Sequence, residues 1–177
     1  MDSRKFDDRW FALQVKTRFE AICARVLRSK GYEKFVPVCK FVSRRSDTRS
    51  LTQPKALFPG YVFCRFNHDA KGLIVTTPGV IRIVGYGKMP CPISEDEIEN
   101  IRLVIRSEYA AVSWPYVTAG QRLRITKGPL RGVTGTLIRV KNDDRLIISV
   151  DLLQRSAAVD VDAECVATAD PVGGNVR

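Results

Sequence analysis

The chain has 177 residues, of which 45% are hydrophobic, so it is long enough for one ordinary domain or two small ones, and its composition excludes a wholly disordered protein. The formal net charge of +10 suggests an anionic partner but does not identify one. Residues 1–107 hold twenty Lys or Arg against eleven Asp or Glu, whereas residues 108–177 hold nine against eight. The positive charge therefore belongs to the first part of the chain.

The cysteine pattern and the charged N-terminus are typical of a protein in the reducing cytoplasm. An odd number of cysteines without a Cys-x-x-Cys pair does not suggest a disulfide framework, and small apolar core residues are their simplest reading. These cysteines are Cys23, Cys39, Cys64, Cys91 and Cys165. The charged N-terminus has no signal-peptide run, and no stretch approaches the roughly 18 apolar residues that span a bilayer. We expect a cytoplasmic, soluble protein without a membrane partner.

The first predicted elements are a strand and a helix. After a charged leader over residues 1–9, residues 10–15 are aromatic and apolar enough for a strand. Thr17 and Glu20 have the spacing of a capping box, and Gly31 is expected to end the helix that follows. The helix is predicted from an apolar stripe made of Phe19, Ile22, Cys23, Val26 and Leu27.

The next segment is expected to be extended and then basic. Residues 32–42 are rich in Phe and Val but contain a proline, which predicts a bend or an edge position. Residues 43–54 carry Arg44, Arg45 and Arg49 among serines and threonines. This composition predicts a mobile basic loop or hairpin tip.

The stretch from 55 to 66 predicts a central strand that is preceded by a Pro-Gly turn. Pro59 fixes its own φ and biases Phe58 towards extended geometry, while Gly60 can adopt angles closed to other residues. The six residues that follow are mostly aromatic or β-branched, as in a buried strand. Phe58 lies at the mouth of this strand, where we expect it to be exposed.

Another strand and helix follow. Residues 68–76 predict one or two helical turns, residues 80–84 a strand, and residues 85–92, with two glycines and two prolines, a loop. Ser94 and Glu97 form a second capping-box pattern. The helix behind it is predicted from Ile98, Ile101 and Ile105.

The last third predicts a small β domain. Residues 108–117 are neither periodic nor cleanly polar, and they are expected to form a linker. Short β-like runs separated by turn residues follow at 121–126, 134–141, 145–151 and 157–161. This spacing predicts a small barrel, and residues 169–177 are expected to be a loose tail.

Three stretches together resemble the NusG family of transcription elongation factors. They are Trp-Phe at 10–11, Leu-Phe-Pro-Gly-Tyr-Val-Phe at 57–63 with Thr-Pro-Gly-Val at 77–80, and residues 117–139 with Gly-Pro-Leu-Arg-Gly at 128–132. The resemblance implies an α+β protein. An N-terminal NusG-type α/β domain (10–107), with an antiparallel sheet and flanking helices, would be joined by a linker (108–117) to a small SH3-like β-barrel, the KOW domain (118–168).

The resemblance also implies a partner. In this family the N-terminal domain docks on the clamp helices of the largest RNA polymerase subunit, by recognition of a helix in an apolar depression. The corresponding surface here would comprise Trp10, Phe11, Leu13, Phe58, Pro59, Tyr61 and Val80. A cluster of aromatic residues is typical of an interface hot spot, although plain core packing explains Leu13 and Val80 equally well.

Nucleic acid is a second partner that the resemblance implies, through non-template DNA beside the polymerase. The candidate contacts are Lys16, Arg18, Arg44, Arg45 and Thr77. Attraction of these cations to phosphates would be nonspecific and salt-dependent. The alternative for the charged residues is a solvated surface.

In the predicted KOW domain, Gly128, Gly132 and Gly135 are first explained by backbone geometry. The resemblance implies a partner face that binds a ribosomal protein or Rho, here with Leu130, Leu152, Leu153 and Arg155. A large aromatic residue often centres that face, yet this chain has Leu-Leu-Gln at 152–154. The departure favours a specialised, operon-selective paralogue over a general factor.

The resulting hypothesis is a monomeric factor that binds elongating polymerase and suppresses pausing or termination at selected operons. The alternatives are a general housekeeping factor that couples polymerase to Rho or the ribosome, and a ribosome- or RNA-binding KOW protein. An enzyme is not expected, because His68 is the single histidine and no nucleophile pattern, phosphate loop or metal-spaced cluster is present. We expect no cofactor and no metal.

Overall fold

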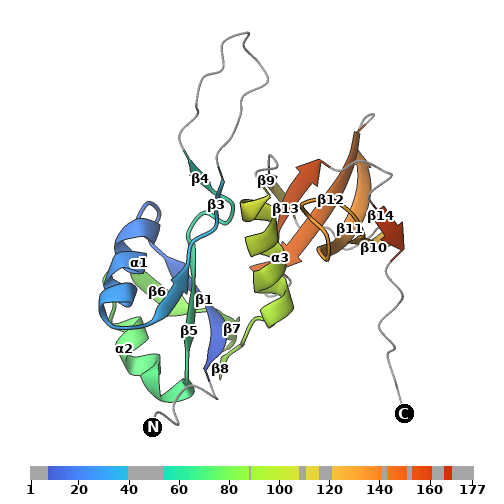
Figure 1. The fold of residues 1–177 in the computed structure, drawn as a ribbon. Coiled ribbons are helices and arrows are strands. Elements are labelled where there is room, and N and C mark those ends of the chain that lie inside the picture. The colour runs from blue at the N-terminus through green and yellow to red at the C-terminus, as the bar shows by residue number, and fades with distance from the viewer. Residues whose placement is uncertain are drawn as a thin grey trace, which may run out of the picture. The chain divides into compact units, whose positions relative to one another are not determined.

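The protein is described by a computed structural model over residues 8–39, 54–87, 89–107, 111–115, 121–140, 143–150, 153–160 and 166–168. Contacts between residues divide the chain into two units. The first unit contains a four-stranded sheet with two helices, and the second contains a six-stranded sheet (Figure 1). The chain therefore combines helices with antiparallel sheets, as the sequence predicts.

The sheet of the first unit has the strand order β2-β5-β1-β6. Its strands are β1 (Arg9–Val15), β2 (Glu33–Phe35), β5 (Tyr61–Phe66) and β6 (Val80–Ile83), and every neighbouring pair is antiparallel. The strand after the Pro-Gly pair, β5, lies between β2 and β1. The prediction of a central strand is confirmed.

One face of this sheet packs against two helices, α1 (Glu20–Ser29) and α2 (Lys71–Val75). Since successive strand residues point to opposite faces, alternate positions of β1 and β5 contribute to this core. Its buried members are Phe11, Leu13, Val15, Cys23, Ala24, Leu27, Val62, Cys64, Phe66 and Ile74. Burial of each large apolar side chain contributes about 1.5–3 kcal/mol. The short helix η2 (His68–Ala70) precedes α2, so the predicted helical turns are confirmed.

The aromatic rings on the opposite face correct one prediction. Phe58 is 1% exposed, and its ring lies edge-on against Phe63, with 5.9 Å between ring centroids. Phe35 of β2 packs on the same Phe63 ring at 6.0 Å. The expectation that Phe58 is exposed is wrong, because Phe63 offers it an aromatic contact within the sheet.

The end of α1 follows its sequence signal. Gly31 has a φ of +85°, its N–H donates to the carbonyl of Arg28, and the Tyr32 N–H donates to the carbonyl of Leu27. These two bonds are a Schellman cap, which satisfies the last carbonyls of the helix. The prediction that Gly31 ends α1 is confirmed.

Two small ribbons and a third helix complete the N-terminal half of the chain. The ribbon of β3 (Val38–Cys39) and β4 (Lys55–Ala56) is antiparallel, and the predicted basic tip lies largely outside the described residues. A hairpin of β7 (Gly85–Tyr86) and β8 (Met89–Pro90) forms where the sequence predicted a loop. The predicted second helix is α3 (Glu95–Arg106), in which Ile98 and Ile101 are buried.

The sheet of the second unit has the order β14-β10-β11-β12-β13-β9. Its strands are β9 (Ala111–Pro115), β10 (Gln121–Ile125), β11 (Thr134–Val140), β12 (Asp143–Val150), β13 (Arg155–Asp160) and β14 (Val166–Thr168). The four predicted strands are confirmed, whereas β9, within the segment predicted as a linker, and β14 were not anticipated. In the described part of the chain, no pairing closes β9 onto β14 into a barrel.

Candidate functional site

Two Pro-Gly turns carry the motifs that the sequence analysis singled out. In the turn 58–61 the Tyr61 N–H donates to the Phe58 carbonyl at 3.2 Å, and Gly60 has a φ of +83°. In the turn 77–80 the Val80 N–H donates to the Thr77 carbonyl at 3.0 Å, and Gly79 has a φ of +89°. Proline at the second position and glycine with positive φ at the third are the signature of a type II turn.

Both turns bind the end of β1 through consecutive residues. The Val15 N–H donates to the Gly60 carbonyl and the Lys16 N–H donates to the Gly79 carbonyl, each at 2.8 Å. The two turns thus lie on either side of the β1 end. We call residues 15–18, 59–61 and 78–80 together the turn rim.

The start of α1 contacts both turns. The Gly60 N–H donates to Oε1 of Glu20 at 2.8 Å, and a Cβ added to Gly79 would lie 2.7 Å from Cδ1 of Phe19. The predicted capping box of Thr17 and Glu20 is wrong, because the N-cap of α1 is Phe19 and no side chain caps its first turn. The Glu20 carboxylate accepts instead from an amide far along the chain, in a charge-assisted hydrogen bond.

The turn rim exposes both apolar and cationic groups. Pro59 is exposed and Tyr61 is half-buried. Val80 is half-buried and packs partly against the helix-side core. Lys16 and Arg18 are exposed, and Arg18 has a φ of +68°, a conformation that costs a non-glycine residue energy and often marks a functional site.

A row of side chains extends the turn rim across the sheet. Gln14 of β1 lies opposite Tyr61 on one side and opposite Arg82 on the other. Directly opposed residues share a sheet face, and the exposed Arg82 donates from Nε to Oε1 of Gln14 at 2.7 Å. Sequence reasoning missed Arg82, although a single cation among the apolar residues of a predicted strand is a signal for an outward-facing position.

Four of the seven predicted docking residues are buried. Leu13 is 0% exposed and Phe11 8%, with the Phe11 ring 4.5 Å from that of Phe66 between centroids. Trp10 is 1% exposed, and Phe58 belongs to the aromatic cluster described above. These four side chains are core residues in this structure, whereas Pro59, Tyr61 and Val80 reach the surface.

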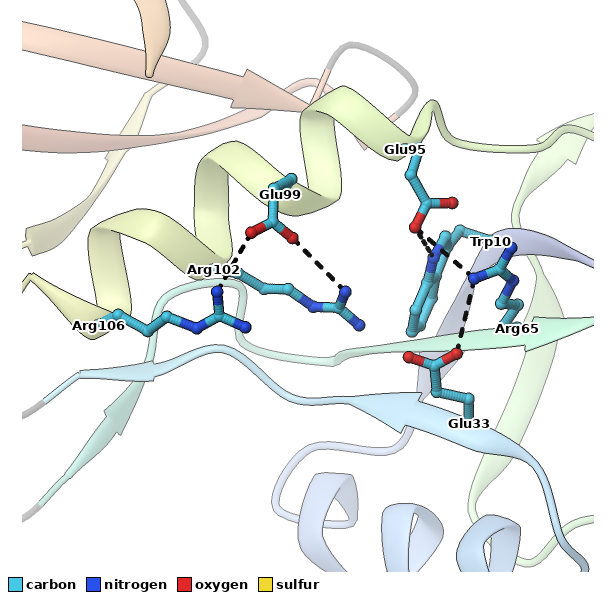
Figure 2. Close-up of polar contacts among 7 residues, drawn as sticks. All are labelled: Trp10, Glu33, Arg65, Glu95, Glu99, Arg102 and Arg106. Carbon is cyan, nitrogen blue, oxygen red and sulfur yellow. Dashed lines mark hydrogen bonds and ion pairs between the residues drawn. The ribbon is translucent and has the colours of Figure 1, made fainter. Parts of the chain in front are cut away.

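Trp10 is part of a polar network at the other end of β1 (Figure 2). Its indole N–H donates to Oε1 of Glu95 at 3.2 Å, and Nη1 of Arg65 lies 3.7 Å from Oε1 of Glu95 and from Oε2 of Glu33. Arg65 also donates from Nε to the Asp8 carbonyl at 3.3 Å. These partly exposed ion pairs contribute little energy each, and the network joins β1, β2 and β5 to the start of α3.

The structure exposes some of the predicted nucleic-acid contacts and buries another. Lys16 and Arg18 are exposed, and Arg44 and Arg45 lie outside the described residues. Thr77 is 2% exposed, because its hydroxyl accepts from Nζ of Lys30 at 2.9 Å and donates to the carbonyl of Leu73 at 3.2 Å. Its hydroxyl is used within the fold, so an external contact through Thr77 is not supported.

The predicted partner face of the second unit is also mostly internal. Leu130 is 3% exposed and Leu153 7%, Arg155 is exposed, and Leu152 lies outside the described residues. The turn that contains Leu130 closes through a Val133 N–H to Leu130 carbonyl bond of 3.0 Å, with Gly132 at a φ of +94°. The backbone explanation for this glycine is confirmed.

Three cysteines in the described part of the chain, Cys23, Cys39 and Cys64, are buried with free thiols. Burial raises the pKa of the Cys23 and Cys39 thiols from 9.0 to about 11 and that of Cys64 to about 12, so all three are poor nucleophiles at neutral pH. Within the same part of the chain, no His, Cys, Asp and Glu side chains are grouped for metal binding. None of the helices described is long and apolar enough to span a membrane.

A family model and curated relatives that match this chain are named NusG. The family model "Transcription termination factor nusG" matches residues 8–102. The "Transcription termination/antitermination protein NusG" of Thermus thermophilus is 26% identical over 154 residues, which cover 81% of this chain and 84% of the relative. The protein of the same name from Pasteurella multocida is 29% identical over 169 residues, with 87% and 91% covered.

A solved structure described as "Domain interaction in Thermotoga maritima NusG" has a similar fold. Its TM-score is 0.56 at 18% sequence identity, and the alignment covers 92% of this chain and 98% of that chain. At this identity the similarity concerns the fold, whereas the family model matches more than half of the sequence. The chain belongs to the NusG family.

Proposed function

We propose that this protein is a transcription elongation factor that binds RNA polymerase and suppresses pausing or termination. The observation that carries the proposal is the turn rim of a NusG-family chain. Its backbone is held by hydrogen bonds from Val15 and Lys16, and it presents Pro59, Tyr61 and Val80 beside exposed cations. A rigid surface of this composition is suited to binding another macromolecule.

The proposed docking partner is the pair of clamp helices of the largest polymerase subunit. Aromatic side chains that retain exposure on a rigid backbone are typical anchors of protein interfaces, and Tyr61 meets this description. Pro59 adds an apolar surface with no backbone donor to desolvate. Because Trp10, Phe11, Leu13 and Phe58 are buried, we assign them to the core of this unit rather than to contact with the partner.

The cations next to the docking residues suit the phosphates of the non-template strand. Lys16, Arg18 and Arg82 are exposed. Phosphate contacts would add sequence-independent affinity that falls with salt, by a slope of about 0.7 per contact for a single strand. Nucleic acid would thus strengthen binding to polymerase without selecting a sequence.

The proposed activity needs no bond-making step. A factor that binds the pause-resistant polymerase a hundredfold more tightly than the paused state shifts the equilibrium by about 2.7 kcal/mol. By reciprocity, binding of the factor raises the ratio of pause-resistant to paused polymerase by the same hundredfold. Differential binding through the turn rim would therefore be sufficient for antitermination.

Within the second unit, the residues from about 118 to 168 are proposed to form a KOW domain of the SH3-like barrel type. The supports are the sheet of short strands and the glycine turn at 128–132. A ribosomal protein or Rho would be its partner, and Arg155 is the exposed member of the predicted face. Tethering would keep that partner at a high effective concentration near polymerase.

Two forms of the proposal differ in scope. The sequence Leu-Leu-Gln at 152–154, which lacks an aromatic residue, favours an operon-selective paralogue. The termination/antitermination name shared by the matched relatives favours a general factor. Occupancy of the protein along transcribed genes separates the two, since a general factor follows polymerase everywhere and a selective one follows it in a few operons.

The test of the proposal is co-elution with core RNA polymerase on a sizing column at moderate and high salt. Co-elution that persists at high salt is expected, because the docking contacts are largely apolar. Binding that disappears with salt, together with tight RNA binding without polymerase, would replace the proposal with an RNA-binding function.

A further inference from the structure

The two residues at the start of α1 brace the two Pro-Gly turns in different ways. Phe19 packs so closely against Gly79 that no side chain fits there, and Glu20 accepts a hydrogen bond from the Gly60 N–H. These contacts leave the first turn of α1 without a side-chain cap. The polar group that could stabilise the helix start is used for a turn of the rim.

The hydrogen bond to Glu20 acts on the part of the turn that distinguishes its type. Type I and type II turns differ mainly in the orientation of the middle peptide group, here the one that joins Pro59 to Gly60. The Gly60 N–H belongs to that peptide group, and it donates to Oε1 of Glu20 at 2.8 Å. The bond therefore favours the type II orientation.

The neighbouring peptide group is held as well. The Gly60 carbonyl accepts from the Val15 N–H at 2.8 Å, and the turn closes through the Tyr61 N–H to the Phe58 carbonyl. Three hydrogen bonds thus define the turn, and two of them belong to the backbone. Glu20 provides the third, the one that a side-chain substitution can remove.

We infer that Glu20 is a positioning residue of the polymerase-docking surface, which holds Pro59 and Tyr61 in the orientation that binds. The inference rests on the proposed function. A turn fixed before binding avoids an ordering cost, and a turn that visits a second orientation lowers the apparent affinity in proportion to the time spent there. Glu20 would act through the turn without touching the partner.

Three substitutions in the full-length protein test the positioning role through the dissociation constant for core RNA polymerase. Glu20→Ala removes the acceptor, and we expect about tenfold weaker binding, the scale of one charge-assisted hydrogen bond. Glu20→Gln keeps an oxygen at the same position and should restore affinity to within about twofold. Glu97→Ala removes a glutamate at the start of α3, and it should leave affinity unchanged.

A double-mutant cycle with Tyr61→Ala separates positioning from a general loss of stability. If Glu20 acts through the turn that carries Tyr61, then Glu20→Ala should weaken binding much less when Tyr61 is already truncated. Additive effects of the two substitutions on affinity would overturn the inference, as would equal losses in Glu20→Ala and Glu20→Gln.

Amide hydrogen exchange in the free protein provides a readout that does not depend on polymerase. The Gly60 amide should exchange faster in Glu20→Ala than in the wild type, and slowly in Glu20→Gln. Equal exchange in all three proteins would overturn the brace even if polymerase binds. Wild-type protein that shows the brace but fails to bind polymerase would instead overturn the proposed function.

Discussion

The starts of α1 and α3 carry the same residue pattern but are built differently. At α3 the Ser94 and Glu97 pair bonds reciprocally, with the Glu97 N–H to Oγ of Ser94 at 3.2 Å and the Ser94 N–H to Oε2 of Glu97 at 3.1 Å. At α1 the corresponding glutamate, Glu20, accepts from Gly60, forty positions away in the sequence. The start of α3 is stabilised locally, whereas the start of α1 stabilises the turn rim.

The difference teaches how a local motif yields to a tertiary contact. A carboxylate at a helix start can accept from the helix or from any other amide that the fold brings near it. The Gly60 amide lies in a type II turn that leaves its N–H available, and Glu20 satisfies it. Substitutions at α3 should therefore change stability alone, and those at α1 should also change the docking surface.

The largest predicted effect is a loss of stability at alkaline pH, and it comes from thiols in the core that α1 packs against. Burial raises the pKa of Cys23, on α1, and of Cys64 beside it in the core, whereas α3 contains no cysteine. The folded state keeps these protons above pH 9, where the unfolded state loses them, so the free energy of unfolding falls as the pH rises from about 9 to 11. At about 1.4 kcal/mol for each pKa unit, the loss is on the order of a few kcal/mol, because the two neighbouring thiols interact and their shifts do not add.

Urea denaturation at pH 8 and above measures this dependence. The control is a variant with Cys23→Ala and Cys64→Ala, whose stability should fall less steeply between pH 9 and 11. An equal slope in the wild type and the variant would contradict the assignment of these thiols as buried and protonated.

The contact of Phe19 with Gly79 can be broken by one methyl group. Gly79→Ala places a Cβ within 2.7 Å of the Phe19 ring on a backbone with positive φ, and we expect a loss of roughly 2–4 kcal/mol in the free energy of unfolding. Gly87→Ala is the matched control, because Gly87 also has positive φ but open space around it, and should cost about 1 kcal/mol. Equal shifts of the two urea midpoints would mean that Phe19 does not brace the turn.

The smallest expected effects compare the two hydroxyl residues. Ser94→Ala removes a helix cap and should lower the free energy of unfolding by about 1 kcal/mol. Thr17→Ala removes no cap, and the change should stay within about 0.5 kcal/mol. The urea midpoints of the two variants measure this difference. A loss of stability in Thr17→Ala as large as that in Ser94→Ala would mean that Thr17 does cap α1.

Features set by neighbouring residues were predictable from the sequence. The end of α1 at Gly31 and the capping box of Ser94 depend on a few consecutive positions. The central strand β5 followed from a run of aromatic and β-branched residues. The helix end and the cap depend on local interactions, whereas β5 is also stabilised by its pairing with β1 and β2.

Features set by distant contacts were not predictable in the same way. Phe58 at the mouth of β5 is buried because Phe63 receives its ring, and Trp10 is buried with its indole bound to Glu95. An aromatic residue has the same pattern in a core as in an interface hot spot, so the sequence could not separate them. The same limit applies to Thr77, whose hydroxyl is used by Lys30.

The central claim is that the turn rim binds RNA polymerase, and Tyr61 tests it most directly. We would measure the affinity of the full-length protein for core RNA polymerase in Tyr61→Asp and in Tyr86→Asp, a tyrosine that is 75% exposed on the β7–β8 hairpin. Binding should be lost in Tyr61→Asp and kept in Tyr86→Asp, with both proteins folded by circular dichroism. Wild-type affinity in a folded Tyr61→Asp variant would contradict the account.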